Sequence, residues 1–80
     1  MKLTDLNPKS GETDGKRTHV IFDCPKCRQH RMSIPFEGRV KWEKSGEDFE
    51  TTMLSPSIAH NNGEGCESHF FIRNGEIVMA

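Results

Sequence analysis

The chain has no long apolar run, few cysteines and a small apolar fraction. No stretch approaches the eighteen or more apolar residues that cross a bilayer, so we expect no membrane role. Three cysteines cannot form a closed set of disulfides, and no apolar signal-peptide stretch follows Met1–Leu6, which favours a reducing cytoplasm. A chain of 80 residues buries only about 60% of its unfolded surface, so its core is marginal. We therefore expect an additional stabilising cross-link, such as a bound metal ion.

The chain also lacks a strong net charge, since 11 Lys and Arg face 12 Asp and Glu. The charges are nevertheless unevenly placed: residues 16–44 carry eight basic against three acidic residues, and residues 45–80 carry one against six. This pattern predicts either a polar docking face or two halves whose fields cancel in the fold, and cancellation is favoured. A protein that binds duplex DNA by neutralising phosphates would show a clearer basic excess.

The chain does contain two short clusters of metal-binding residue types. Cys24 and Cys27 form a CxxC motif, and Cys66 and His69 form a CxxH motif further along. Four thiolate and imidazole donors suit tetrahedral zinc in number and type. A redox dithiol is disfavoured, because the βαβ pattern of thioredoxin-like proteins is absent. The motifs predict one structural Zn²⁺ held by these four residues.

The fourth ligand is the least determined of the set. His69 is preferred, because a position at a strand end offers backbone carbonyls that orient the second ring nitrogen of a ligand. His30, three residues after the CxxC motif, and His60 are alternatives. A catalytic zinc would keep water as its fourth ligand beside a base such as Glu67 or Glu64, whereas four protein donors favour a closed structural ion.

Apolar alternation predicts a mostly β fold, a small zinc-ribbon-like antiparallel domain with at most a short helical turn. Runs at 18–23 and 32–36 flank the CxxC motif and form a hairpin, whose second strand Pro35 limits to an edge. Asn74-Gly75 predicts a type I′ turn between strands at 69–73 and 76–79. Further strand-like runs lie at 39–44 and 49–54.

Turn-forming residues predict the irregular parts of the chain. Residues 1–17 form an arm or loop and residues 18–80 a single zinc-stabilised domain. Ser55-Pro56-Ser57 is either a rigid loop that presents hydroxyls or a strand terminator. In the second interpretation, which is favoured, Ser57 caps a short helical turn over 57–61.

Basic side chains near the CxxC motif are candidate contacts for a partner or for phosphates, and they are Lys26, Arg28, Arg31, Arg39 and Lys41. Trp42 and the phenylalanines can stack on bases, as in single-strand binders. The simpler interpretation is favoured: the cations offset thiolate charge and the aromatic residues build the core.

Several segments together resemble a known family. They are Leu3-Thr4-Asp5-Leu6-Asn7-Pro8, the CPxC turn followed by His30, Leu54-Ser55-Pro56-Ser57-Ile58, and Phe70-Phe71-Ile72-Arg73-Asn74-Gly75-Glu76-Ile77. They are similar to a small domain of unknown function common in phages and prophages and sometimes mislabelled ammonia monooxygenase. The resemblance implies a phage accessory zinc protein without a known reaction.

From these features we expect a non-enzymatic interaction module in the cytoplasm. No nucleophile–base pair, phosphate-binding loop or paired-acid site is evident in the sequence. The expected partner is a host or phage protein, for example a host defence protein that the module inhibits. A nucleic-acid-binding module is the alternative, and a zinc-dependent hydrolase with Glu67 as its base is the least favoured interpretation.

Overall fold

The computed structural model describes residues 1–39, 41–61 and 66–80, without the side chains of His60 and Asn61. The elements in this part of the chain are η1 (Leu3–Leu6), β1 (Lys9–Thr13), β2 (Lys16–Asp23), β3 (Arg31–Pro35), β4 (Glu43–Ser45), β5 (Met53–Asn61), β6 (Glu67–Arg73) and β7 (Glu76–Met79). The predicted mostly β antiparallel fold with at most a short helical turn is confirmed. None of the described helical structure has the length and apolarity of a membrane span.

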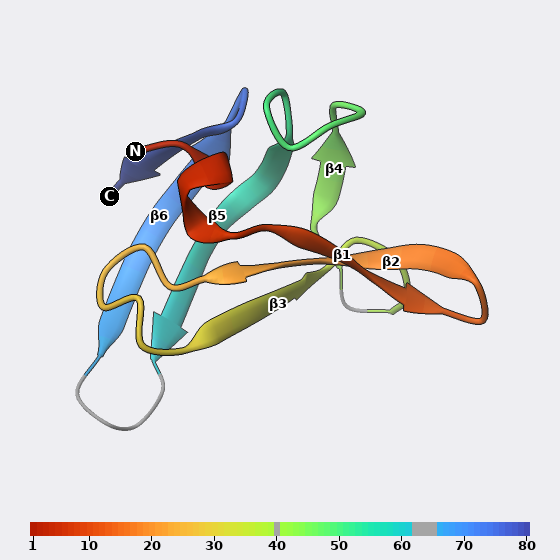
Figure 1. The fold of residues 1–80 in the computed structure, drawn as a ribbon, viewed down its shortest axis with the longest axis horizontal. Coiled ribbons are helices and arrows are strands. Elements are labelled where there is room, and N and C mark those ends of the chain that lie inside the picture. Colours follow the sequence, from red (N-terminus) through yellow and green to blue (C-terminus); the bar gives the residue numbers. More distant parts are fainter. Residues whose placement is uncertain (40, 62–65) are drawn as a thin grey trace.

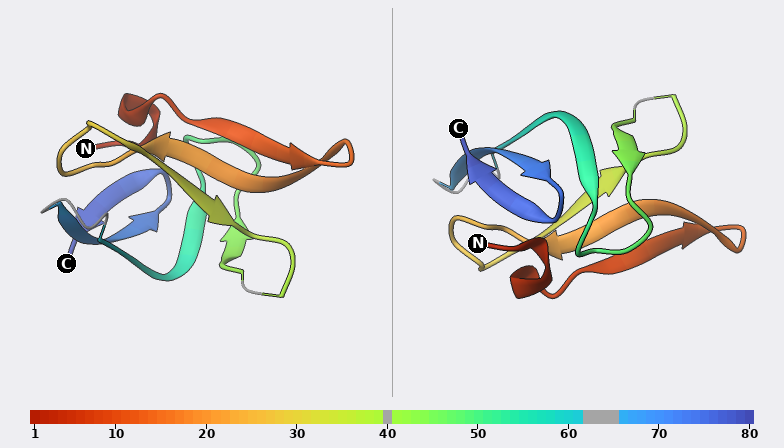
Figure 2. Two further views of the ribbon diagram at one scale, coloured as in Figure 1. Left: turned by 90° about the horizontal axis from the view of Figure 1, so that it is seen from below. Right: turned by 90° about the horizontal axis from the view of Figure 1, so that it is seen from above.

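The strands form two antiparallel sheets, one in the order β1-β2-β3 and one in the order β4-β5-β6-β7 (Figure 1). Figure 2 shows the first sheet lying over the second, with the tip of the β1–β2 hairpin extending beyond it. The chain thus folds as two layers, and the CxxC motif and Cys66 come from different layers.

The core lies between the two layers. From the first layer and η1 come Leu3, Leu6, Val20, Phe22, Cys24, Met32 and Ile34, and from the second come Leu54, Ile58, Phe70, Ile72 and Ile77. Phe22 and Phe70 meet edge to face across the layers, with ring centroids 6.1 Å apart. Full burial of such a side chain contributes about 1.5–3 kcal/mol, so this small set carries most of the apolar stabilisation.

Two predicted hairpins are confirmed. β2 and β3 pair on either side of the CxxC turn, and β3 is an edge strand that ends at Pro35. β6 and β7 are joined by Asn74 and Gly75, whose φ values of 50° and 74° are the two positive values of a type I′ turn. Gly75 is needed there for a further reason, because a Cβ would overlap the carbonyl group of Glu50.

Several segments differ from the sequence-based expectation. Where turn-forming residues predicted a loop, Lys9–Thr13 forms β1, because it pairs with the apolar strand β2 through a bulge at Gly11 and Glu12. The run at 39–44 contributes only the start of β4, and its Val40 lies outside the described residues. The run at 49–54 contributes only its last two residues, because 49–51 form a turn and β5 begins at Met53.

A further difference lies in β5, which continues through Ser55-Pro56-Ser57 rather than ending there. No helical turn forms over the described backbone of 57–61, because Leu54 and Ile58 both pair with β6 and are buried between the layers. The short helical turn of the fold is η1 instead.

Candidate functional site

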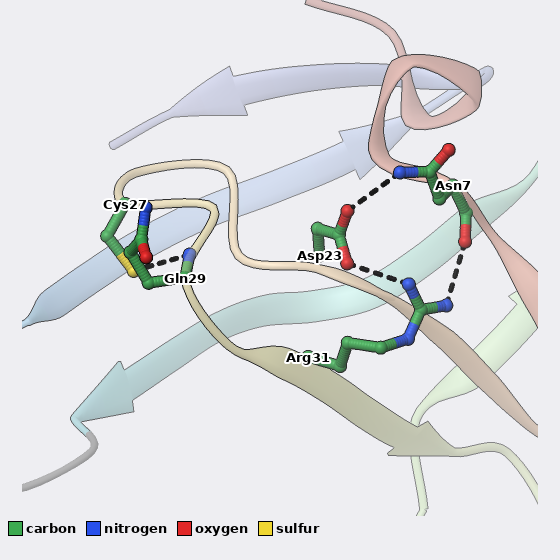
Figure 3. Close-up of polar contacts among 5 residues, drawn as sticks. All are labelled: Asn7, Asp23, Cys27, Gln29 and Arg31. Carbon is green, nitrogen blue, oxygen red and sulfur yellow. Dashed lines mark hydrogen bonds and ion pairs between the residues drawn. The ribbon is translucent and has the colours of Figure 1, made fainter.

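The turn between β2 and β3 gathers sulfur and nitrogen donors. The amide of Cys24 donates to the His30 carbonyl oxygen at 2.9 Å, and the amide of Arg28 donates to the Cys24 carbonyl oxygen at 3.0 Å. The amide of Gln29 donates to Cys27 Sγ at 3.4 Å (Figure 3). These bonds fold the backbone around the sulfurs, as a metal-binding knuckle requires.

Cys66, directly before β6, completes a cluster of four donors. The ligand atoms of Cys24, Cys27, His30 and Cys66 all lie within 4.8 Å of one another. Cys24 Sγ is 3.7 Å from Cys66 Sγ, and Cys27 Sγ is 3.2 Å from His30 Nδ1. Zinc–sulfur bonds of about 2.3 Å place two ligands of a tetrahedral ion about 3.8 Å apart. The donor set and its spacing therefore fit a zinc ion.

The thiols of this cluster do not ionise alike. Burial opposes ionisation of Cys24, but hydrogen bonds from the backbone amides of Cys27 and Lys26 outweigh it and lower the pKa of this thiol to about 7. A hydrogen bond with Cys27, followed by partial burial and by contact with Cys24, raises the pKa of Cys66 to about 11. Adjacent thiolates repel one another, and a divalent cation removes that repulsion as it displaces the protons.

Asn7, Asp23 and Arg31 form a network of polar contacts, the polar clamp, at the base of the turn between β2 and β3 (Figure 3). Asp23 and Arg31 are register partners on β2 and β3, and Arg31 Nη1 lies 2.7 Å from Asp23 Oδ1. Arg31 Nη2 also donates to the Asn7 carbonyl oxygen at 2.8 Å, and Asn7 Nδ2 donates to Asp23 Oδ2 at 2.9 Å. The clamp joins the end of η1 to the base of the metal-binding turn.

A second group of reactive side chains lies on the outer face of the second sheet. Along β6, Ser68, Phe70 and Ile72 point into the protein, whereas His69 is exposed. Ser57, on the neighbouring strand β5, places Oγ 2.8 Å from His69 Nε2. Serine hydrolases use a serine hydroxyl hydrogen-bonded to an imidazole as nucleophile and base, and Ser57 and His69 share that one contact.

The register of β5 against β6 explains why these two side chains meet. Ala59 is the direct partner of His69, and residues two positions from a direct partner lie diagonally across the same face. Ser57 occupies that diagonal position. A bulge places three residues of β5 between the pairs Leu54–Ile72 and Ile58–Phe70, where β6 has one. Bulges redirect side chains and are frequent beside active sites.

Aromatic side chains surround the pair. Trp42 Nε1 donates to the Ser57 carbonyl oxygen at 3.3 Å. On β6, the Phe71 ring lies beside the imidazole of His69, with centroids 6.1 Å apart, and Arg73 stacks 4.4 Å above the Phe71 ring. The pair therefore has an indole on the side of β4 and an aromatic ring further along β6.

The cluster of four donors and the Ser57–His69 pair are connected through β6. Cys66 precedes this strand and His69 lies three residues later. Between them, buried Ser68 approaches the cluster, and the thiol of Cys24 donates to Ser68 Oγ at 3.9 Å. An ion bound to the cluster would thus hold the end of the strand that carries the imidazole.

The structure distributes the predicted ligands between these two sites. It brings together Cys24, Cys27 and Cys66, with His30 as the fourth donor. It places His69 in the pair with Ser57 instead. The side chain of His60 and all of Glu64 lie outside the described residues, and Glu67 is exposed at the start of β6.

The predicted partner-binding residues lie on the first sheet and in the segment that leads from β3 to β4. Lys26 and Arg28 are exposed on the knuckle, and Arg39 and Lys41 are exposed between β3 and β4. The guanidinium group of Arg31 is bound within the polar clamp, by Asp23 and by the Asn7 carbonyl oxygen. A role of these residues in partner binding stays a prediction.

Sequence reasoning missed the Ser57–His69 pair. One signal was present, since one interpretation of Ser55-Pro56-Ser57 was a rigid segment that presents hydroxyls. The second half of the pair was hidden, because His69 follows Cys66 with the spacing of a metal ligand. Only the register of two distant strands joins the hydroxyl to the imidazole.

A family model described as "Bacterial ubiquitination-like system serine protease (BubE)" matches residues 4–80. No curated protein and no solved structure matches the chain. The match agrees with the predicted membership of a small domain family. It describes that family by a reaction in a bacterial system, however, and neither as a phage family nor as one of unknown function.

The match overturns the expectation that the chain is not an enzyme. That expectation rested on the absence of a visible nucleophile–base pair in the sequence. In the fold a serine hydroxyl and an imidazole do meet, Ser57 Oγ and His69 Nε2, and the two residues are twelve positions apart in the sequence.

Proposed function

The chain belongs to the BubE family of bacterial ubiquitination-like system serine proteases, and on that premise we propose that Ser57 is its nucleophile and His69 the general base. The observation that supports this assignment is the 2.8 Å separation between Ser57 Oγ and His69 Nε2. A serine hydroxyl is a weak nucleophile at neutral pH, and an adjacent imidazole activates it by accepting its proton.

The proposed reaction is acyl transfer to serine followed by hydrolysis. Ser57 Oγ attacks the carbonyl carbon of the substrate while its proton moves to His69 Nε2, which requires the tautomer protonated at Nδ1. The resulting imidazolium returns this proton to the leaving amine or alcohol. Water then attacks the acyl-enzyme, with His69 again accepting a proton, and Ser57 is regenerated.

The position of the pair favours a protein substrate. His69 is exposed on the outer face of a sheet and Ser57 is half-buried beside it, so an extended chain can lie across both. The family description names a protease of a ubiquitination-like system, so we propose that the substrate bond is an acyl bond of a protein in that system. We propose that this chain hydrolyses such a bond, in a reducing cytoplasm that keeps its three free cysteines available for metal.

We also propose that Cys24, Cys27, His30 and Cys66 hold one structural Zn²⁺. Four protein donors complete a tetrahedral coordination and leave no position for a reacting water. When bound, the ion supplies no step of the reaction. Its effect is mechanical, since it anchors Cys66 and so the strand from which His69 projects.

A fluorophosphonate probe tests the assignment. Ser57 Oγ should attack the phosphorus atom and displace fluoride, while His69 accepts the proton, and mass spectrometry should locate the adduct on Ser57. Ser57→Ala should abolish labelling, and His69→Ala should slow it at least ~10³-fold, as removal of a catalytic base does in serine proteases.

Ser55→Ala is the matched control, because Ser55 is an exposed hydroxyl two residues from Ser57 on the same strand. It should be labelled at the wild-type rate. Labelling that persists in Ser57→Ala, or a wild-type protein that stays unlabelled while folded, would contradict the proposal.

A further inference from the structure

We infer that Trp42 is a positioning residue for the nucleophile, an inference that rests on the proposed function of Ser57. The indole Nε1–H of Trp42 donates to the backbone carbonyl oxygen of Ser57 at 3.3 Å. The bond reaches the main chain of Ser57 and leaves its hydroxyl for His69. Trp42 therefore acts on the position of the reacting atom through the main chain of Ser57.

Ser57 needs such support because it lies in the bulge of β5. Register pairs with β6 stop at Leu54 and resume at Ile58, and those with β4 extend only to Ser55. In the described part of the chain, Ser57 thus belongs to neither ladder register. The indole supplies a side-chain donor where a regular strand would use a backbone donor of its neighbour.

Trp42 is itself held at a second point. Its backbone N–H donates at 2.8 Å to the carbonyl oxygen of Pro35, which ends β3 in the first layer. Its ring is half-buried and packs against the core. The indole therefore connects the end of the first sheet to the nucleophile-bearing strand of the second.

This connection predicts an effect on the rate of attack and little effect on binding. Displacement of a reacting atom by about 1 Å costs far more in the chemical step than in ground-state affinity. A neutral hydrogen bond contributes about 1 kcal/mol, which corresponds to roughly a fivefold change in rate.

The test removes the N–H and keeps the shape of the ring. Trp42 is the single tryptophan of the chain, so 3-benzothienylalanine, which carries sulfur in place of N–H, can replace it alone. With the fluorophosphonate probe, we expect the maximal labelling rate to fall about fivefold. The probe concentration at half-maximal rate should stay within about twofold of wild type, because binding is not affected.

Phe49→Leu is the matched control for lost aromatic packing, because Phe49 is also half-buried against the core and lies in the loop before β5. It should lower thermal stability and leave the labelling rate unchanged. If the benzothienyl variant is labelled as fast as wild type, Trp42 only packs and the inference is wrong.

Hydrogen exchange of the indole N–H separates this inference from the proposed function. The single indole resonance should be protected in wild type and in Ser57→Ala, because the acceptor is a backbone carbonyl. Exchange as fast as in a free indole would overturn the inference whatever Ser57 does. A protected indole with no labelling of wild-type Ser57 would overturn the proposed function, and with it the catalytic meaning of the contact.

Discussion

His30 and His69 have the same sequence context, each three residues after a cysteine, and very different surroundings in the fold. His30 Nδ1 lies 3.2 Å from Cys27 Sγ inside the knuckle, and His69 Nε2 lies 2.8 Å from Ser57 Oγ on the outer sheet face. An imidazole is both the commonest metal ligand and the commonest general base. At the residue scale, the neighbours of each imidazole are what support proposing His30 as a metal ligand and His69 as a general base.

The two histidines should therefore separate metal binding from catalysis. His30→Ala should lose bound zinc, since it removes one of four donors, and should lower the stability of the fold. His69→Ala should keep one zinc per chain and lose at least ~10³-fold in the rate of serine labelling. Native mass spectrometry gives the metal content and the labelling assay gives the rate. Zinc loss in His69→Ala with full retention in His30→Ala would reverse the assignment.

At the scale of elements, tight turns and one bulge determine how the second sheet is built. The bulge of β5 sets the diagonal approach of Ser57 to His69, and the Asn74-Gly75 turn sets the pairing of β6 with β7. Gly75 also donates its N–H to the Thr52 carbonyl oxygen at 2.8 Å and accepts from the Leu3 N–H at 2.8 Å. This turn therefore anchors the start of β5 and η1 as well as its own hairpin.

Two glycine substitutions should show the effect of that packing. Gly75→Ala and Gly15→Ala both place a Cβ on a backbone with positive φ, at 74° and 80°. A Cβ at Gly15 meets nothing within 4 Å, whereas a Cβ at Gly75 overlaps the Glu50 carbonyl. Gly15→Ala should cost about 1 kcal/mol in free energy of unfolding, and Gly75→Ala clearly more, because the backbone of Glu50 must move. Equal decreases in the free energy of unfolding, measured by denaturant titration, would contradict this prediction, because they would show that the Glu50 backbone moves without cost.

At the scale of the whole molecule, the cluster of four donors brings the two layers together. Cys24, Cys27 and His30 belong to the hairpin of the first sheet, and Cys66 leads into the second sheet. The apolar core between the layers is small, so a cross-link between the layers at this cluster would add stability that the core alone does not supply. The same link fixes the strand that carries His69.

Removal of the metal should therefore unfold the protein and abolish labelling together. Structural zinc contributes about 10–16 kcal/mol of apparent binding free energy at neutral pH, which is as large as the whole stability of an ordinary domain. Titration with a chelator should remove the native circular dichroism signal and the labelling of Ser57 in parallel, and added zinc should restore both. A chelated protein that keeps its fold and its labelling rate would contradict the structural role of the ion.

Much of this protein was determined by local sequence pattern. Apolar alternation predicts β2, β3, β6 and β7, because a strand with one buried face must alternate. Asn74-Gly75 predicts its turn because both residues tolerate positive φ. Three cysteines in two motifs predict a metal site because so few residue types bind zinc.

What only the tertiary structure decided depends on register between distant segments. The pairing of His69 with Ser57 follows from how β5 meets β6 across a bulge, and the donor cluster follows from how the turn between β2 and β3 meets Cys66 before β6. A shift of one residue would turn each side chain of a strand to the other face. No local propensity encodes that register, because it is set by the burial of Leu54, Ile58, Phe70 and Ile72 between two layers that exist only in the folded chain.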